Sequence, residues 1–135
     1  MNVTAYTFDT TGEHTVKYYL MEDYDSKYTV PSFEGNTNLK YINIPEGVTK
    51  INMKTFKDCE INTVILPDTI EEIKAEAFLG RIDTIILYST TPPTLPSNHA
   101  VFNPDKRFNL VIPEEALSIY STTIPWSTFN LQTEP

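Results

Sequence analysis

A short apolar pattern that recurs three times between Leu39 and Leu87 most constrains how this chain can fold. Apolar residues occupy the first, fourth and sixth places of every copy, and the copies read LKYINIP at 39–45, INTVILP at 61–67 and IDTIILY at 82–88. The links between copies also repeat, with Val48 and Ile70, Ile51 and Ile73, and Phe56 and Phe78 each 22 positions apart. Stacked turns of one repeated unit are therefore expected.

The period and the spacing together predict a leucine-rich-repeat solenoid, whose units have about 20–29 residues and the strand pattern L-x-x-L-x-L. Phe33 begins a half-repeat, and FNLVIP at 108–113 restores the strand after the proline-rich link 89–96. We expect a β-rich α+β fold with about four rungs, in which neighbouring rungs share a core that neither could enclose alone. The predicted solenoid covers residues 33–135.

The two ends of a solenoid expose its core, so each end requires an atypical unit. At the N-terminus, residues 3–8 and 15–20 are rich in β-branched and aromatic residues and flank a polar turn. This pattern predicts a β-hairpin cap over residues 1–32, with a further strand near 28–30. At the C-terminus we expect a short helix at 114–120 and a cap formed by Leu117, Tyr120 and Trp126, which the tail with Phe129 and Leu131 completes.

The links predict the opposite wall of the solenoid. Val48 with Ile51, and Ile70 with Ile73, suit a short strand or one helical turn. The segment 75–78 favours an additional helical turn, and Phe56 and Phe78 are expected to fill the space between rungs.

Composition limits the classes of partner. The 135 residues include 10 basic and 18 acidic side chains, for a net charge of −8. Nucleic acid and anionic membrane surfaces are therefore disfavoured partners, and the chain has no apolar run long enough for membrane insertion. The N-terminal residues do not resemble a signal peptide, so we expect either a cytoplasmic protein or a mature segment without its leader. Cys59 is the single cysteine, and we interpret it as a packed thiol.

No set of residues indicates catalysis, a metal or a cofactor. His14 and His99 lie 85 positions apart with no neighbouring ligand, whereas a metal site needs several close ligands. The pairs Glu71-Glu72 and Glu114-Glu115 are adjacent in sequence and point in different directions, so they fit solvated surface better than an acid–base couple. Calcium binding by Asp23 and Asp25 lacks the loop signature. We expect a protein that is not an enzyme.

The predicted sheet offers a surface instead. Because the first, fourth and sixth residues of each strand point inward, the third and fifth point outward. Stacking would gather Ile65, Ile86 and Val111 into an apolar stripe beside hydroxyl groups and Tyr41. The alternative is that β-branched residues simply suit strands. The predicted partner-binding face comprises Tyr41, Asn43, Thr63, Ile65, Thr84, Ile86, Asn109 and Val111.

These residues resemble a known group, the BspA-type leucine-rich repeats of bacterial surface proteins. The resemblance rests on the pattern L-x-x-I-x-L-P-x-x-V-x-x-I-x-x-x-A-F, which 61–78 matches nearly completely and 39–59 matches with Thr55 in place of Ala. The C-terminal features Thr91-Pro92-Pro93, Phe102, Tyr120 and Trp126 are also similar to the family's closing segment. The resemblance implies an extracellular or cell-surface role in adhesion or in binding a host or neighbouring protein.

Three other readings remain open from the sequence. The chain could be a structural spacer or cap of a longer surface protein. It could bind carbohydrate through Tyr41, Tyr88 or Trp126, although Trp126 fits the core better. A homodimer could form through the sheet edges or through the predicted face.

Overall fold

The computed structural model describes residues 21–22, 28–97, 100–105 and 107–134. The predicted hairpin at 3–8 and 15–20 lies outside the described residues, as do His14, His99, Asp23 and Asp25. Of the N-terminal segment, the structure describes two short strands, β1 (Met21–Glu22) and β2 (Tyr28–Thr29), which pair antiparallel. The strand predicted near 28–30 is therefore present as β2.

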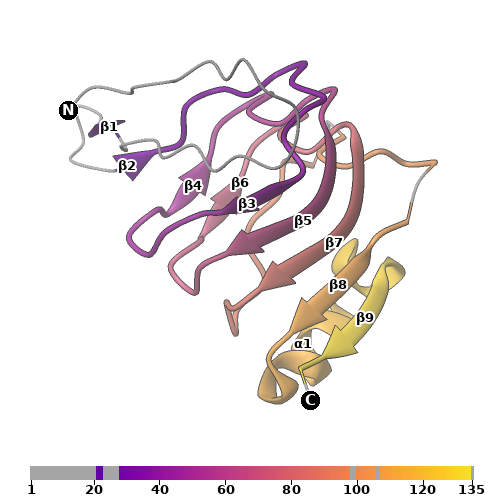
Figure 1. The fold of residues 1–135 in the computed structure, drawn as a ribbon. Coiled ribbons are helices and arrows are strands. Elements are labelled where there is room, and N and C mark those ends of the chain that lie inside the picture. Colours follow the sequence, from indigo (N-terminus) through magenta and orange to yellow (C-terminus); the bar gives the residue numbers. More distant parts are fainter. Residues whose placement is uncertain (1–20, 23–27, 98–99, 106, 135) are drawn as a thin grey trace.

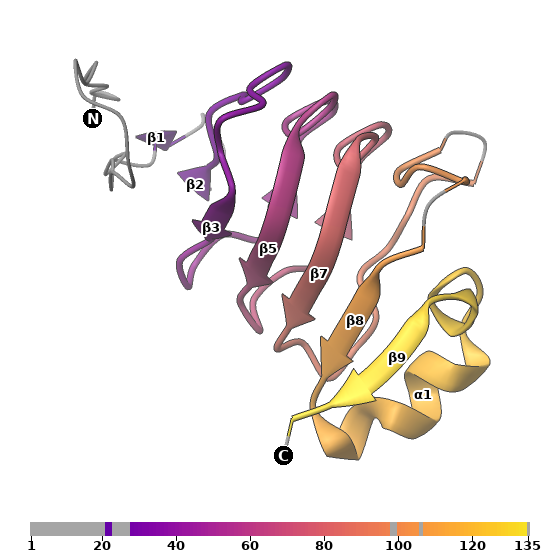
Figure 2. The ribbon, with the colours of Figure 1, turned by 45° about the vertical axis from the view of Figure 1, so that its right-hand side comes forward.

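A five-stranded parallel sheet forms one broad face of the molecule (Figures 1 and 2). Its strands, in spatial order, are β3 (Tyr41–Asn43), β5 (Glu60–Leu66), β7 (Arg81–Leu87), β8 (Asn109–Ile112) and β9 (Asn130–Thr133). Val64 pairs in register with Ile85, and Ile85 with Leu110, so equivalent places of successive repeats lie side by side. The predicted solenoid of stacked repeats is confirmed.

The opposite wall is a two-stranded parallel sheet of β4 (Lys50–Ile51) and β6 (Glu72–Ile73), seen behind the main sheet in Figure 2. Of the two forms predicted for this wall, the short strand is the one observed. Ile51 and Ile73 pair in register and are fully buried. Side chains from the two walls fill the interior, which accounts for the alternation of buried and exposed places along β5 and β7.

A ladder of phenylalanine rings closes the edge of the core between the two walls. Phe33, Phe56, Phe78 and Phe102 are all buried and come from successive turns of the chain. Neighbouring rings stack nearly parallel, with centroids 5.7, 5.2 and 5.9 Å apart along this series. The prediction that Phe56 and Phe78 fill the space between rungs is confirmed, and the spacing is one at which aromatic rings attract one another.

The helical turn predicted for 75–78 is wrong, because this segment is an irregular turn. Glu76 has φ 57° and its counterpart Lys54 in the preceding repeat has φ 62°, which is outside the right-handed helical region. The amide of Phe56 donates to the carbonyl of Ala77 at 2.8 Å, and that of Phe78 to Val101 at 3.0 Å. In each turn, alternate backbone amides thus donate to the next rung, whereas the amide of Ala77, for example, donates to the carbonyl of Lys74 within the same turn.

After β8 the chain forms a 3-10 turn, η1 (Glu114–Ala116), the helix α1 (Leu117–Thr122) and a second 3-10 turn, η2 (Trp126–Thr128). The predicted helix is present and extends to Thr122. It packs behind β8 and β9 (Figure 2). Tyr120 and Trp126 are buried, and Phe102, Tyr120 and Phe129 contact the Trp126 ring edge-on.

Two details of the predicted C-terminus are wrong. Leu117 is not part of the buried core, because 41% of it is exposed. The tail is also more than a covering segment, since residues 130–133 form β9, a fifth strand parallel to β8. The main sheet therefore has one strand more than the four that the sequence pattern predicted. Phe129 and Leu131 are half-buried against the core, which lets the tail pair with β8.

Candidate binding face on the parallel sheet

The structure places all eight residues of the predicted face on the outer side of the main sheet. Register pairs align them in two rows across the strands. The first row is Tyr41, Thr63, Thr84 and Asn109, and the second row is Asn43, Ile65, Ile86 and Val111. We call these two rows, together with Asn130 and Gln132 of β9, the sheet face. That the sheet face binds a partner stays a prediction.

Exposure differs along the rows. Tyr41 is 58% exposed and Asn43 is also exposed, whereas Ile65, Ile86 and Val111 are half-buried. These three aliphatic residues shield one another from solvent, because each has a neighbour on both sides in the same row. The apolar stripe is therefore a shallow continuous strip and not a set of protruding side chains.

Strand β9 adds two residues to the sheet face that sequence reasoning missed. Asn130 continues the first row beside Asn109, and Gln132 continues the second row beside Val111. The Asn130 side-chain amide donates to Oδ1 of Asn109 at 2.6 Å, which joins the two strands through side chains as well as backbone. A signal for this strand exists, since Leu131 follows Leu110 by 21 positions, a step already used between the earlier strands.

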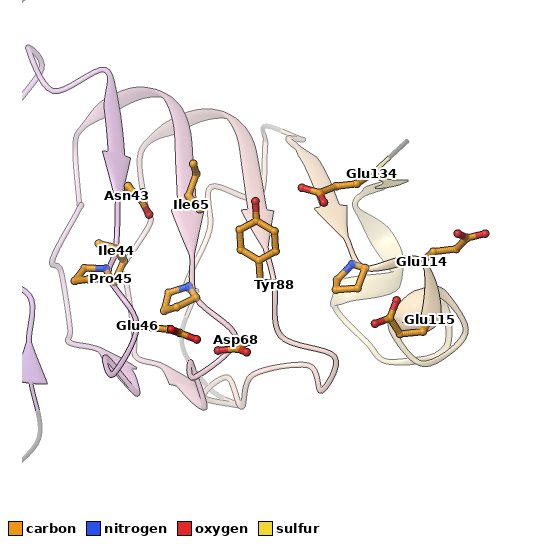
Figure 3. Close-up of a pocket in the computed structure, with 12 residues that line it drawn as sticks. Asn43, Ile44, Pro45, Glu46, Ile65, Asp68, Tyr88, Glu114, Glu115 and Glu134 are labelled. Atoms are coloured by element: carbon orange, nitrogen blue, oxygen red, sulfur yellow. The ribbon is translucent and has the colours of Figure 1, made fainter.

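An open hollow of about 670 Å³ lies where the strands of the sheet face end (Figure 3). Tyr88 stands in its middle with its ring in the solvent and 43% of the residue exposed. Prolines occupy the matching place after β3, β5 and β8. The lining residues are Asn43, Ile44, Pro45, Glu46, Ile65, Pro67, Asp68, Tyr88, Pro113, Glu114, Glu115 and Glu134.

The hollow is strongly acidic. Its lining contains five carboxylates and no lysine or arginine, and the carboxylates belong to Glu46, Asp68, Glu114, Glu115 and Glu134. Within the described ranges, none of the five takes part in a salt bridge. Their charges therefore remain uncompensated by protein groups in this part of the structure.

The electrostatic effect is visible on Tyr88. The negative charge of Glu134 raises the pKa of the Tyr88 phenol above its ordinary value, with a smaller contribution from desolvation. Ionised tyrosine would place a second negative charge beside the carboxylate, which disfavours loss of the proton. The phenol consequently stays neutral to a higher pH than a free tyrosine would.

Replacing Glu134 by Gln is expected to lower the pKa of Tyr88 toward the ordinary tyrosine value of about 10, because the main source of repulsion is removed. Titration of ring carbons in protein labelled with ¹³C-tyrosine measures this, and the Tyr88→Phe spectrum assigns the resonance. Glu60→Gln removes an exposed carboxylate at the other end of the strands and should leave the Tyr88 pKa unchanged. An unchanged pKa in Glu134→Gln would contradict the arrangement in Figure 3.

The other residues that were considered for chemistry, Cys59 and the Glu71-Glu72 pair, lie in the core and on the exposed surface, respectively. Burial raises the pKa of the Cys59 thiol, and its Sγ lies 3.0 Å from the carbonyl oxygen of Phe33, so this thiol is packed. Glu71 and Glu72 are exposed on the opposite wall. Among the described residues, no three His, Cys, Asp or Glu side chains converge as metal ligands.

The aromatic residues considered for carbohydrate binding separate into two groups. Trp126 is only 2% exposed and donates its indole N–H to the carbonyl of Pro93 at 3.3 Å, so it belongs to the core. Tyr41 and Tyr88 are exposed and lie on or next to the sheet face.

A parallel sheet whose successive strands repeat at steps of 21 to 25 residues, with an aligned phenylalanine in each turn, defines a leucine-rich-repeat solenoid. The family model of the BspA-type leucine-rich repeat region matches residues 8–85 and 29–123, with six copies. The chain belongs to the BspA-type leucine-rich-repeat family. Proteins with such repeats are typically surface proteins and are generally non-enzymatic.

A comparison with curated proteins gave no match. In the described part of the chain, no helix is long and apolar enough to cross a membrane.

Proposed function

We propose that this protein is a non-enzymatic binding or adhesion module, acting outside the cell or at its surface, that uses the sheet face to hold another protein. The observation that carries the proposal is the alignment of ten outward side chains in two rows across five strands, with an apolar stripe in one of them. Solenoids generally present such extended surfaces to their partners.

The composition of the sheet face fits a protein partner. Ile65, Ile86 and Val111 would lose water on contact, at about 25 cal/mol for each Å² of apolar surface removed. Hydroxyl and amide groups of Thr63, Thr84 and the β9 residues flank them and can form hydrogen bonds at the rim. Most of these side chains are short and held by paired strands, so little conformational entropy is lost on binding.

The proposal includes the division of the chain into an N-terminal cap at 1–32 and a solenoid at 33–135 that ends in its own cap. Support for the C-terminal cap comes from Tyr120 and Trp126, which are buried against the last turn and whose polar atoms donate to the carbonyls of Ser89 and Pro93. A solenoid without such covering units would expose its core at both ends.

Replacing both Ile65 and Ile86 by Asp is expected to weaken partner binding at least about 100-fold, because two desolvated charges without counter-ions would enter the centre of the interface. Immobilised protein is exposed to solubilised extracellular-matrix proteins, the retained protein is purified, and its Kd for each variant is measured by surface plasmon resonance. Size-exclusion chromatography of the same variants tests whether the partner is a second copy.

The matched control is Ile119→Asp with Ile124→Asp. These residues are 44% and 82% exposed, lie outside the sheet face, and give the same change in charge. Circular dichroism checks that all variants fold, and Ile65→Thr with Ile86→Thr replaces the aspartate variant if that one does not. Equal binding by the Ile65/Ile86 variant, or loss confined to the Ile119/Ile124 variant, would refute the sheet face as the contact surface.

A further inference from the structure

We propose that the partner of the sheet face presents a basic, extended polypeptide segment, and that a lysine or arginine side chain of this segment seats against Tyr88 in the acidic hollow. This inference rests on the proposed function, because it names the chemistry of the protein that the sheet face holds.

The distribution of charge over the described residues points to a cationic partner. Lys40 pairs with Glu60 at 3.7 Å, and Arg81 with Asp83 at 3.8 Å, at the start of the strands. Lys57 pairs with Glu76 at 3.0 Å in the turn that carries the phenylalanine ladder. The charged groups that line the hollow at the far end of the strands are all carboxylates, so the sheet face is complementary to positive charge at one end.

Tyr88 gives this acidic region a contact for a cation. Where the neighbouring strands are followed by the compact rings of Pro45, Pro67 and Pro113, the third repeat carries an aromatic ring that projects into the hollow (Figure 3). The face of a tyrosine ring attracts an ammonium or guanidinium group. Carboxylates around the ring supply acceptors for the N–H donors of the same group.

The hollow and the apolar stripe form one continuous surface, since Ile65 lines the hollow and also lies in the second row of the sheet face. A segment crossing from the stripe into the hollow would first cover aliphatic side chains and then meet carboxylates. This order favours a segment that combines apolar residues with lysine or arginine. A small metal ion is disfavoured, because the five carboxylates are spread around the rim and no three of them converge.

The test uses a fluorescein-labelled peptide of about 12 residues with alternating Lys and Thr, whose binding to the full chain is followed by fluorescence anisotropy at low ionic strength. The same peptide with Glu in place of Lys is the comparison. We expect the Lys peptide to bind and the Glu peptide not to bind. Binding should weaken when salt is added, because exposed charges are screened.

Two variants with equal net charge locate the interaction. Glu46→Gln with Glu134→Gln removes two carboxylates from the hollow, and Glu71→Gln with Glu72→Gln removes two exposed ones from the opposite wall. We expect the hollow variant to weaken binding of the Lys peptide about five- to tenfold and the control to leave it nearly unchanged. Tyr88→Ser should weaken it about two- to fivefold, whereas Tyr88→Phe, which keeps the ring, should retain it.

Equal weakening by the two charge variants would overturn the inference, since it would mean attraction to the net charge only. Absence of binding by the Lys peptide, or equal binding by the Glu peptide, would also overturn it. These outcomes leave the proposed function untouched. A captured partner that is lost on Ile65→Asp with Ile86→Asp but not on Glu46→Gln with Glu134→Gln would support the sheet face and refute the basic segment.

Discussion

Phe56→Ala is expected to lower the free energy of unfolding by about 3–5 kcal/mol, because it removes a fully buried ring from the middle of the phenylalanine ladder. Phe56 is 1% exposed and stacks on Phe33 and Phe78 with centroids 5.7 and 5.2 Å away. The surrounding backbone cannot close the space, since the turns on both sides are held by hydrogen bonds between rungs. A domain of this size is stable by only about 5–15 kcal/mol, so the loss is a large share of the total.

Urea unfolding followed by circular dichroism measures this difference. Met53→Ala is the control, because Met53 lies in the same turn but is 58% exposed. Its replacement should change the free energy of unfolding by less than about 0.5 kcal/mol. If Phe56→Ala destabilised the protein no more than Met53→Ala, the ladder could not be a main source of cohesion between rungs.

Trp126→Ala is expected to have an effect of similar size, about 3–5 kcal/mol, at the C-terminal end of the solenoid. The indole fills the space between Tyr120, Phe102 and Phe129, and its loss also leaves the Pro93 carbonyl without its indole donor. A buried polar group without a partner adds to the penalty. Because η2 leads directly into β9, the last strand should lose support as well.

Hydrogen exchange measured by NMR separates the local effect from the global one. In Trp126→Ala the amides of β9 should exchange faster relative to those of β5 than they do in the wild type, because the last strand is held from one side only. The free energy of unfolding of each variant is measured by circular dichroism, because the substitution removes the single tryptophan that fluorescence would report on. Trp126→Phe should recover part of the stability, and Ile124→Ala, at an 82% exposed neighbour, should change little. Stability unaffected by Trp126→Ala would contradict its role in the core.

Most of the solenoid could be predicted from the sequence. The places of Val64, Ile85 and Phe78 in the interior follow from a burial pattern that is repeated in each copy, and every copy reinforces the same register. The turn at 75–78 could not be predicted in the same way. Its helix-forming composition is a weak local preference, and hydrogen bonds to the next rung outweigh it.

The candidate site likewise has a part that the sequence pattern predicted and a part that it did not. The eight outward residues follow from strand alternation, which a sequence displays directly. Asn130 and Gln132 were missed because β9 is separated from β8 by a helix, and a four-residue strand carries little pattern of its own. The acidic hollow was missed for a different reason. Glu46, Asp68 and Glu114 each follow the proline at the end of a strand, but Glu134 belongs to the tail, and no repeat spacing shows that it lies beside them.

By itself, the sequence determined the period, the inward places and the family, because these depend on which residues avoid water within each repeat. Only the tertiary structure decided that Glu134 comes close enough to Tyr88 to raise the pKa of its phenol. It also decided that the tail adds a parallel strand at the edge of the sheet. Such proximities arise when distant segments are brought together by packing around Trp126 and Phe129. Packing of this kind is a property of the assembled core and of no single stretch of chain.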